Sequence, residues 1–421
     1  MDDLGTVLAE RLDATRVRTL SLFAPLDHEH LVGQPDVLLS PPLWDLGHIA
    51  AYEELWLARR LGGHPPLHPE LDDVYDASET PRRARGTAAI LDQGAAHHYL
   101  RIVRARSLEV LAACDLAIGD DPLTREGFVF EMVAEHEAQH TETVLQALQM
   151  LPAGAYLPPA RRPLPEPDAR GARSRCWIEV PAGSFAMGAE GAGFAYDCER
   201  PRHERDLPGF LIARDPVSVR EHLDFIEDDG YSRRELWSDE GWSWREREGV
   251  VAPLYWERDG EGGWLVREFD RVTPVDPDRI LCHVSAHEAD AHARWAGARL
   301  PTEAEWERAA QGASPGVAAA NLDQLGFGTS AVGAYPAAPG GCRHMLGDVW
   351  EWTADALEGY PGFRAFPYRG YAEVFFGQGY RVLRGGSWAT QPIAARTSFR
   401  NWDLPQRRQI FSGLRLAKDL A

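Results

Sequence analysis

The sequence predicts an α+β protein in which a helical bundle is followed by an irregular domain of short strands and loops. Three observations predict this order. Residues 1–150 carry long stretches with apolar residues at helical spacing, residues 151–175 are rich in Pro, Arg and Gly without periodicity, and residues 176–421 alternate short strand-like runs with Gly- and Trp-rich turns. We therefore expect a helical domain over 1–150, a partly extended linker over 151–175 and a second domain over 176–421.

The composition limits the classes of partner. The chain has 421 residues and a formal net charge of −20, which argues against a phosphate-binding surface for nucleic acid. No apolar run is long enough to span a bilayer, and the acidic N-terminal stretch lacks the basic start and apolar core of a signal peptide. The 5 cysteines are scattered and never form a C-x-x-C pair. A reduced, cytoplasmic protein without nucleic-acid or membrane partners is therefore expected, and we expect a monomer.

Amphipathic helices are predicted over about residues 1–25, 40–61, 87–114 and 124–150. Helices of this length with short connections are typical of a bundle. The second helix has the clearest ends, because Ser40 is a candidate N-cap and Gly62 stops the helix. Along it, Trp44 and His48 lie on one face. A histidine is therefore expected on a core-facing stripe.

The fourth helix carries an H-E-x-x-H motif on its inner face. His136 and His140 lie one turn apart, and neutral imidazoles at that spacing can bind one transition metal from the same side. The motif is typical of zinc peptidases, in which Glu137 would be the general base. The simpler interpretation is that both histidines are ordinary core or surface residues.

The position of a third ligand distinguishes a zinc-peptidase site from a non-haem iron site. The zinc-peptidase interpretation needs one downstream, and residues 141–154 contain no histidine. His48 on the second helix is the better candidate. Three nitrogen ligands leave positions open for substrates and dioxygen, which suits non-haem iron better than a closed structural zinc site.

Two polar clusters are candidates for substrate binding. Arg82, Arg83 and Arg85 form a basic cluster that can clamp a carboxylate, or else a solvated loop. Near the C-terminal end, Asp403 lies among arginines that include Arg407. Such a group can bind a zwitterionic amino acid, although a surface ion-pair network is an equally good interpretation.

The second domain is expected to contain short elements and further candidate residues. A strand pair joined by a turn is predicted within 176–189, short helices within 217–230 and 284–297, and short strands with tight turns within 347–355 and 380–390. Tyr368 and Tyr371 can donate a proton or an electron near a metal, although a buried core tyrosine is commoner. His283, His287 and His292 are not predicted to form a second metal site, because they share a helical face only in part.

These motifs together resemble a known family. SPPLWDLGHIAAYEELWL and EHEAQHTETVLQAL are similar to the DinB-like helical domain of the ergothioneine-pathway sulfoxide synthases. VPAGSFAMGA, ARLPTEAEWERAA, GDVWEWTAD and RVLRGGSW resemble the formylglycine-generating-enzyme fold, a C-type-lectin-like domain. With FRNWDLPQRRQIFSGLR near the end, the resemblance covers nearly the whole chain. The cysteine pair of a formylglycine-generating enzyme is missing, so that activity is not implied.

The resemblance implies roles for named residues. His48, His136 and His140 match the family's iron(II) ligands, and Gln139 matches a residue that contacts the histidine-derived substrate. Asn401 and Trp402 match residues near its trimethylammonium group, where an aromatic face suits a quaternary cation. The residues that match the site for γ-glutamylcysteine are Arg82, Arg85, Asp403 and Arg407. Tyr368 and Tyr371 match a tyrosine pair of which one is the proton donor, and we favour Tyr368.

The implied reaction is oxidative carbon–sulfur bond formation between hercynine (Nα-trimethylhistidine) and γ-glutamylcysteine, with iron(II) and dioxygen, to give a sulfoxide. The bundle is expected to supply the iron and part of the arginine clamp, and the lectin-like loops to close the site. Alternatives are a selenoneine synthase that uses a selenosugar, a sulfoxide synthase that uses cysteine, a zinc peptidase, and a non-enzymatic lectin-like binding module with a helical bundle attached.

Overall fold

The computed structural model describes residues 4–116, 121–167, 175–191 and 193–420. The chain forms two compact units. Unit 1 comprises Met1–Pro159 and Ala192–Phe194, and unit 2 comprises Ala160–Gly191 and Ala195–Ala421. Unit 1 is helical and unit 2 mixes helices with short strands, so the predicted α+β fold class is confirmed.

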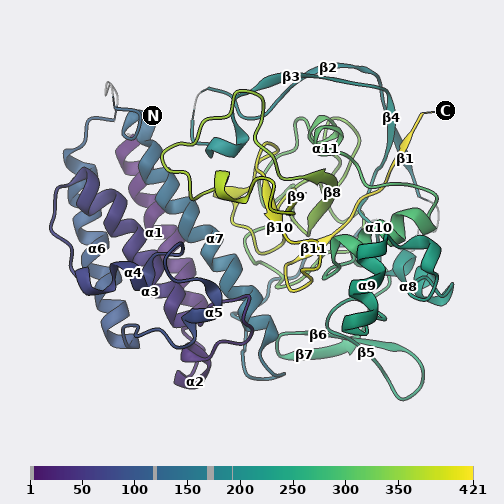
Figure 1. Cartoon of the computed structure of the whole chain (residues 1–421), viewed down its shortest axis with the longest axis horizontal. Helices are drawn as coiled ribbons and strands as arrows, with labels where there is room; N and C mark the ends of the chain where they lie inside the picture. Colours follow the sequence, from purple (N-terminus) through teal and green to yellow (C-terminus); the bar gives the residue numbers. More distant parts are fainter. Residues whose placement is uncertain (1–3, 117–120, 168–174, 192, 421) are drawn as a thin grey trace. The chain divides into compact units, whose positions relative to one another are not determined.

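The long helices of unit 1 pack as a bundle (Figure 1). They are α1 (Leu4–Phe23), α3 (Pro42–Glu53), α6 (Gln93–Ala113) and α7 (Phe128–Met150). Short helical segments connect them, namely α2 (His28–Val32), η2 (Pro69–Leu71), α4 (Asp72–Tyr75), α5 (Arg82–Arg85) and η3 (Arg125–Gly127). Leu8 and Leu12 of α1 are buried, as their helical spacing predicts.

Helix α3 begins and ends differently from the prediction. Ser40 is not its N-cap: Pro41 holds that position without a side-chain hydrogen bond, and the Ser40 hydroxyl instead accepts a hydrogen bond from Arg85 Nη1 at 2.8 Å. After Glu53 the helix continues as the π-helical segment η1 (Glu54–Leu61), which ends at Gly62 as predicted. A π-helix is not visible in apolar spacing, because that spacing assumes the α-helical repeat.

Helices α6 and α7 start later than the sequence pattern indicates. Helix α6 begins at Gln93, where the Asp92 side chain accepts a hydrogen bond from the Ala95 amide at 2.8 Å. Helix α7 begins at Phe128, because Glu126 (φ 52°) and Gly127 (φ 74°) have left-handed backbone conformations that no α-helix continues through.

Unit 2 is built from small sheets and short helices. One sheet has the strand order β1 (Trp177–Val180), β4 (Phe210–Ala213), β12 (Ala417–Asp419); another has the order β10 (Asn401–Asp403), β9 (Arg381–Arg384), β8 (Trp350–Ala356), β11 (Ser412–Gly413). Strands β2 (Gly183–Met187) and β3 (His203–Leu207) form a pair, and β5 (Trp256–Arg258), β6 (Trp264–Glu268) and β7 (Arg271–Pro274) form a further sheet. The helices are α8 (Val219–Glu227), α9 (Asp239–Glu248), α10 (Ala286–Trp295) and α11 (Glu303–Ala309), and 3-10 segments are η4 (Asp197–Glu199), η5 (Arg234–Leu236), η6 (Glu373–Phe375) and η7 (Pro392–Ala394).

The predicted helices within 217–230 and 284–297 are confirmed as α8 and α10, and the strands within 347–355 and 380–390 as β8 and β9. The predicted strand pair within 176–189 is wrong. Both strands exist, but β1 pairs with β4 and β2 pairs with β3. A local turn signal therefore does not decide the partner of a short strand, because pairing with a distant strand competes with the hairpin.

Residues 151–159 of the Pro-rich segment belong to unit 1, and residues 160–167 belong to unit 2. The Arg162 amide donates to the Leu325 carbonyl at 2.7 Å, and the Leu164 side chain lies against Gly326. Within the described ranges, no helix has both the length and the apolar character needed to cross a bilayer.

Candidate metal centre

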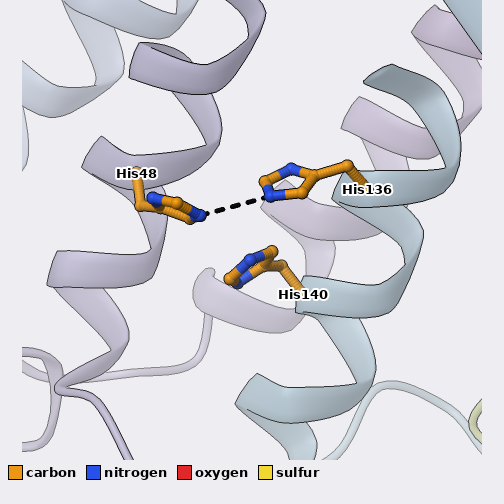
Figure 2. Close-up of side chains that lie close together, drawn as sticks. All are labelled: His48, His136 and His140. Carbon is orange, nitrogen blue, oxygen red and sulfur yellow. Dashed lines mark hydrogen bonds between the residues drawn. The ribbon is translucent and has the colours of Figure 1, made fainter. Parts of the chain in front are cut away.

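Three histidines from two helices of unit 1 point toward one another (Figure 2). His48 comes from α3, and His136 and His140 come from successive turns of α7. Their candidate ligand nitrogens all lie within 4.8 Å of one another, and His48 Nε2 lies 3.2 Å from His136 Nε2. Among the described residues this is the only group of three or more His, Cys, Asp or Glu side chains that could hold one ion.

The geometry fits a transition metal. Two nitrogens bound to one ion at about 2.1 Å and at right angles lie about 3 Å apart, which matches the separation of the two Nε2 atoms. Burial, followed by the charge of His140, lowers the pKa of His48 well below its usual value. Burial and the other two imidazoles lower the pKa of His136 in the same way. Both rings are therefore neutral at pH 7, which is the form that binds metal.

Glu137 does not face the histidines. It lies at i+1 from His136, so its side chain enters the bundle core, where it is 1% exposed. It accepts hydrogen bonds from Arg16 Nε at 2.8 Å, from Thr19 Oγ1 at 2.8 Å and from Arg104 Nη2 at 3.3 Å. A carboxylate held in this way is not available as the general base of a zinc peptidase.

The structure adds partners of the histidines that the sequence reasoning missed. Asp45 Oδ1 lies 3.1 Å from His140 Nδ1, and His48 Nδ1 donates to the Tyr75 carbonyl at 2.6 Å. Asp45 lies three residues before His48 on the same helix, so its spacing was a usable signal. The Tyr75 carbonyl had no such signal, because Tyr75 ends the short helix α4 in the connection between η1 and α6.

Aromatic rings pack against two of the histidines. The Trp44 ring stacks on His48, with centroids 4.8 Å apart and planes at 14°. The Tyr52 ring stacks on His136, with centroids 3.6 Å apart and planes at 7°. Trp44 was expected on the His48 face, and the spacing of four residues between His48 and Tyr52 would have identified the second ring.

The predicted substrate residues of unit 1 have different environments. Arg82 is exposed on α5, whereas Arg85 on the same helix is buried. Arg85 Nε donates to the Thr80 carbonyl at 3.0 Å and its Cζ lies 3.6 Å from the Trp44 ring centroid. Burial lowers the pKa of Arg85 to about 10. Gln139 is half-buried, and its Nε2 lies 3.4 Å from the Glu135 carbonyl oxygen.

In unit 2 the structure brings several predicted residues together around β10. The Trp402 ring lies edge-on to Tyr371 at 5.7 Å and tilted against Phe375 at 5.7 Å. Tyr371 also stacks on Tyr196 with centroids 3.8 Å apart. Asn401 precedes Trp402 in the strand, and its Oδ1 accepts the Trp402 amide at 2.9 Å.

The charged residues that follow form a pair. Asp403 Oδ2 lies 3.8 Å from Arg407 Nε, and Arg407 is buried. The pairing of Asp403 with Arg407 has the charges that complement a zwitterionic amino acid.

Tyr368 is half-buried in the segment before η6.

The histidines of α10 and the residues before it do not form a second centre among the described residues. His283 lies edge-on to Tyr255, and His287 lies against Trp244. His292 stacks instead on His222 of α8.

Comparison with known proteins gives matches to both units. Residues 161–420 match the Sulfatase-modifying factor enzyme 1-like domain, and residues 11–144 match the DinB superfamily. The chain is 43% identical over 435 residues to a protein named hercynine oxygenase from Mycobacterium tuberculosis, covering 98% of this chain and 99% of that one. It is 42% identical over 439 residues to a hercynine oxygenase of Mycolicibacterium smegmatis, with coverage of 98% and 99%. A formylglycine-generating enzyme of Thermomonospora curvata is 33% identical over 216 residues, which cover 42% of this chain and 70% of that enzyme.

Proposed function

The chain belongs to the family of the hercynine oxygenases, and on that premise we propose that it joins hercynine to γ-glutamylcysteine with iron(II) and dioxygen. The imidazole C–H of hercynine and the thiol S–H of the dipeptide are lost, a C–S bond forms, one oxygen atom of dioxygen becomes the sulfoxide and the other leaves in water. The observation that carries the proposal is the convergence of the imidazoles of His48, His136 and His140, whose candidate ligand nitrogens lie within 4.8 Å of one another.

When bound, iron(II) would lower the pKa of the substrate thiol and supply the redox chemistry that activates dioxygen. The protein's own residues hold and orient the substrates. Gln139, one residue before a ligand, is proposed to contact the hercynine imidazole. Asn401 and Trp402 are proposed to bind its trimethylammonium group. The ring of Trp402, with Tyr371 and Phe375 beside it, offers the aromatic faces that quaternary cations prefer.

The dipeptide is proposed to be held by charge. It carries two carboxylates and one amine, and the proposed set offers three guanidinium groups and one carboxylate: Arg82, Arg85, Asp403 and Arg407. The Asp403–Arg407 pair matches an ammonium and a carboxylate on one carbon atom. Tyr368 is proposed to donate the proton that directs the reaction to sulfoxide. Tyr371 remains the second candidate for that role.

The alternative functions include enzymes that use another sulfur or selenium donor. A selenoneine synthase or a cysteine-using synthase would keep the histidines and hercynine but would not need the full arginine set. A zinc peptidase would need Glu137 as base, and that carboxylate is occupied by Arg16 and Arg104. A binding module without activity would not need the histidines. Location in the cytoplasm stays a prediction.

The test is a comparison of donors. Iron(II)-loaded protein is given hercynine and dioxygen with γ-glutamylcysteine, cysteine or a selenosugar, and kcat/KM is measured for each. We expect the highest value for γ-glutamylcysteine. A higher value for cysteine or the selenosugar would reassign the donor. If no donor supported turnover, the proposed reaction would be rejected.

A further inference from the structure

The segment Trp44–His48 at the start of α3 surrounds the metal-binding nitrogens with supporting contacts. Trp44 stacks on His48 and donates its Nε1–H to the Val74 carbonyl at 2.9 Å. Gly47 lies under the Tyr75 ring: a Cβ at this position would come within 2.2 Å of ring atoms. A larger residue at position 47 would therefore have to displace the Tyr75 ring, whose backbone carbonyl accepts the hydrogen bond from His48 Nδ1.

Asp45 in the same segment supports a ligand from another helix. It is 1% exposed, and its Oδ1 lies 3.1 Å from His140 Nδ1. Its Oδ2 is buried and accepts no hydrogen bond from the described residues. Burying a carboxylate costs free energy unless it is paired, and Asp45 is compensated by the His140 ring and by the nearby Arg85 charge.

A carboxylate only accepts hydrogen bonds, so Nδ1 of His140 is the nitrogen that carries a proton toward Asp45, and Nε2 is the nitrogen left to bind a metal. The ligands are thus supported in different ways. His140 is supported by a carboxylate, His48 by a backbone carbonyl, and His136 by the stacked ring of Tyr52. Carboxylate partners orient a ligating imidazole and raise its basicity.

We propose that Asp45 is a positioning residue of the metal centre, which fixes the Nδ1–H tautomer of His140 and presents its Nε2 to the metal. The proposal rests on the proposed metal site and names a residue that acts through a ligand rather than on substrate. Replacing Asp45 should therefore lower the affinity for the metal more than it lowers the affinity for the substrates.

The test is anaerobic titration of the full chain with iron(II), using Asp45→Asn. We expect the affinity for iron(II) to fall by about tenfold to a hundredfold, since loss of a partner to a ligating histidine has that effect. Asp72→Asn is the matched control, because Asp72 pairs with Arg59 on the surface of the same unit. An Asp45→Asn affinity equal to that of wild type would overturn the proposal.

A second measurement separates positioning from folding. Zinc(II) affinity is measured in a cycle of Asp45→Asn, His140→Ala and the double variant. If Asp45 acts through His140, the second substitution adds less than a twofold further loss in the His140→Ala background. A full additional loss would mean that Asp45 acts on the fold, which would contradict the proposal. Failure of the wild-type protein to bind either metal would instead reject the proposed function.

Discussion

The Arg16 guanidinium in α1 donates to the Glu137 carboxylate in α7 through Nε at 2.8 Å and Nη2 at 3.1 Å. Its Nη2 also lies 2.7 Å from Glu53 Oε2, and Arg104 contacts both carboxylates from α6. The acidic residue between the two α7 histidines thus belongs to a buried ion-pair network that joins α1, α3, α6 and α7. It holds α7 in the bundle rather than taking part in chemistry.

Glu137→Gln should therefore destabilise unit 1 without abolishing metal binding. Removing one charge of a buried network costs about 3 kcal/mol, because the remaining charges lose their partner. Thermal unfolding and metal titration at a temperature well below the transition measure the two effects. Glu126→Gln, in the η3 turn, is the control for stability. Loss of metal binding in a folded Glu137→Gln protein would contradict this role.

The same network predicts a pH dependence. Burial opposes ionisation of Glu53, but the charges of Arg104 and Arg16 outweigh it and hold its pKa at about 2, against an ordinary value of 4.5. A carboxyl with a lowered pKa stabilises the fold above its unfolded value and loses that contribution as the pH falls. Stability should therefore decline between about pH 4.5 and pH 2.

Hydrogen exchange of the α1 and α6 amides, corrected for intrinsic rates, measures this decline within unit 1 of the metal-free protein. In the Glu53→Gln variant these amides should be less protected from exchange at pH 5 than in wild type. Between pH 4.5 and pH 2 they should lose less protection than the wild-type amides do. An equal loss of protection in wild type and variant would show that another group is responsible.

Sequence spacing predicted that the candidate ligand histidines face the interior of the bundle, because they lie at positions that a helix places on one face. His136 and His140 are i and i+4, and His48 shares its face with Trp44. The role of Glu137 was not predicted correctly by the motif, because a residue at i+1 is rotated by about 100° and its surroundings depend on three other helices. Support of His48 by Tyr75 depends on a long connection, which local spacing does not describe.

The arginine clamp predicts a difference between neighbours on α5. Arg82→Ala should raise KM for γ-glutamylcysteine by about tenfold to a hundredfold, since a hydrogen bond to a charged group contributes about 1.5–3 kcal/mol. The hercynine KM should change little. Arg83→Ala is the matched control, because Arg83 is exposed on the same helix and is not part of the proposed clamp. An equal rise in both KM values for Arg82→Ala would contradict the assignment.

The two tyrosines are predicted to differ in the products that their variants form. Tyr368→Phe should give less sulfoxide and more oxidation of the thiol alone, because the proposed proton donor is lost. Tyr371→Phe keeps the ring that lies between Tyr196 and Trp402, so its product ratio should stay near wild type. Mass spectrometry of the products measures both ratios. The reverse pattern would move the role to Tyr371.

The proposed carbon–sulfur bond formation is tested by the mass of the product formed under isotopically labelled dioxygen. Protein reconstituted anaerobically with iron(II) is given hercynine, γ-glutamylcysteine and ¹⁸O₂. We expect one product that joins both substrates with the loss of two hydrogens and carries a single labelled oxygen, and we expect no such product from His140→Ala. A metal-loaded wild-type protein that yields only oxidised dipeptide, or a joined product without the label, would contradict the proposed reaction.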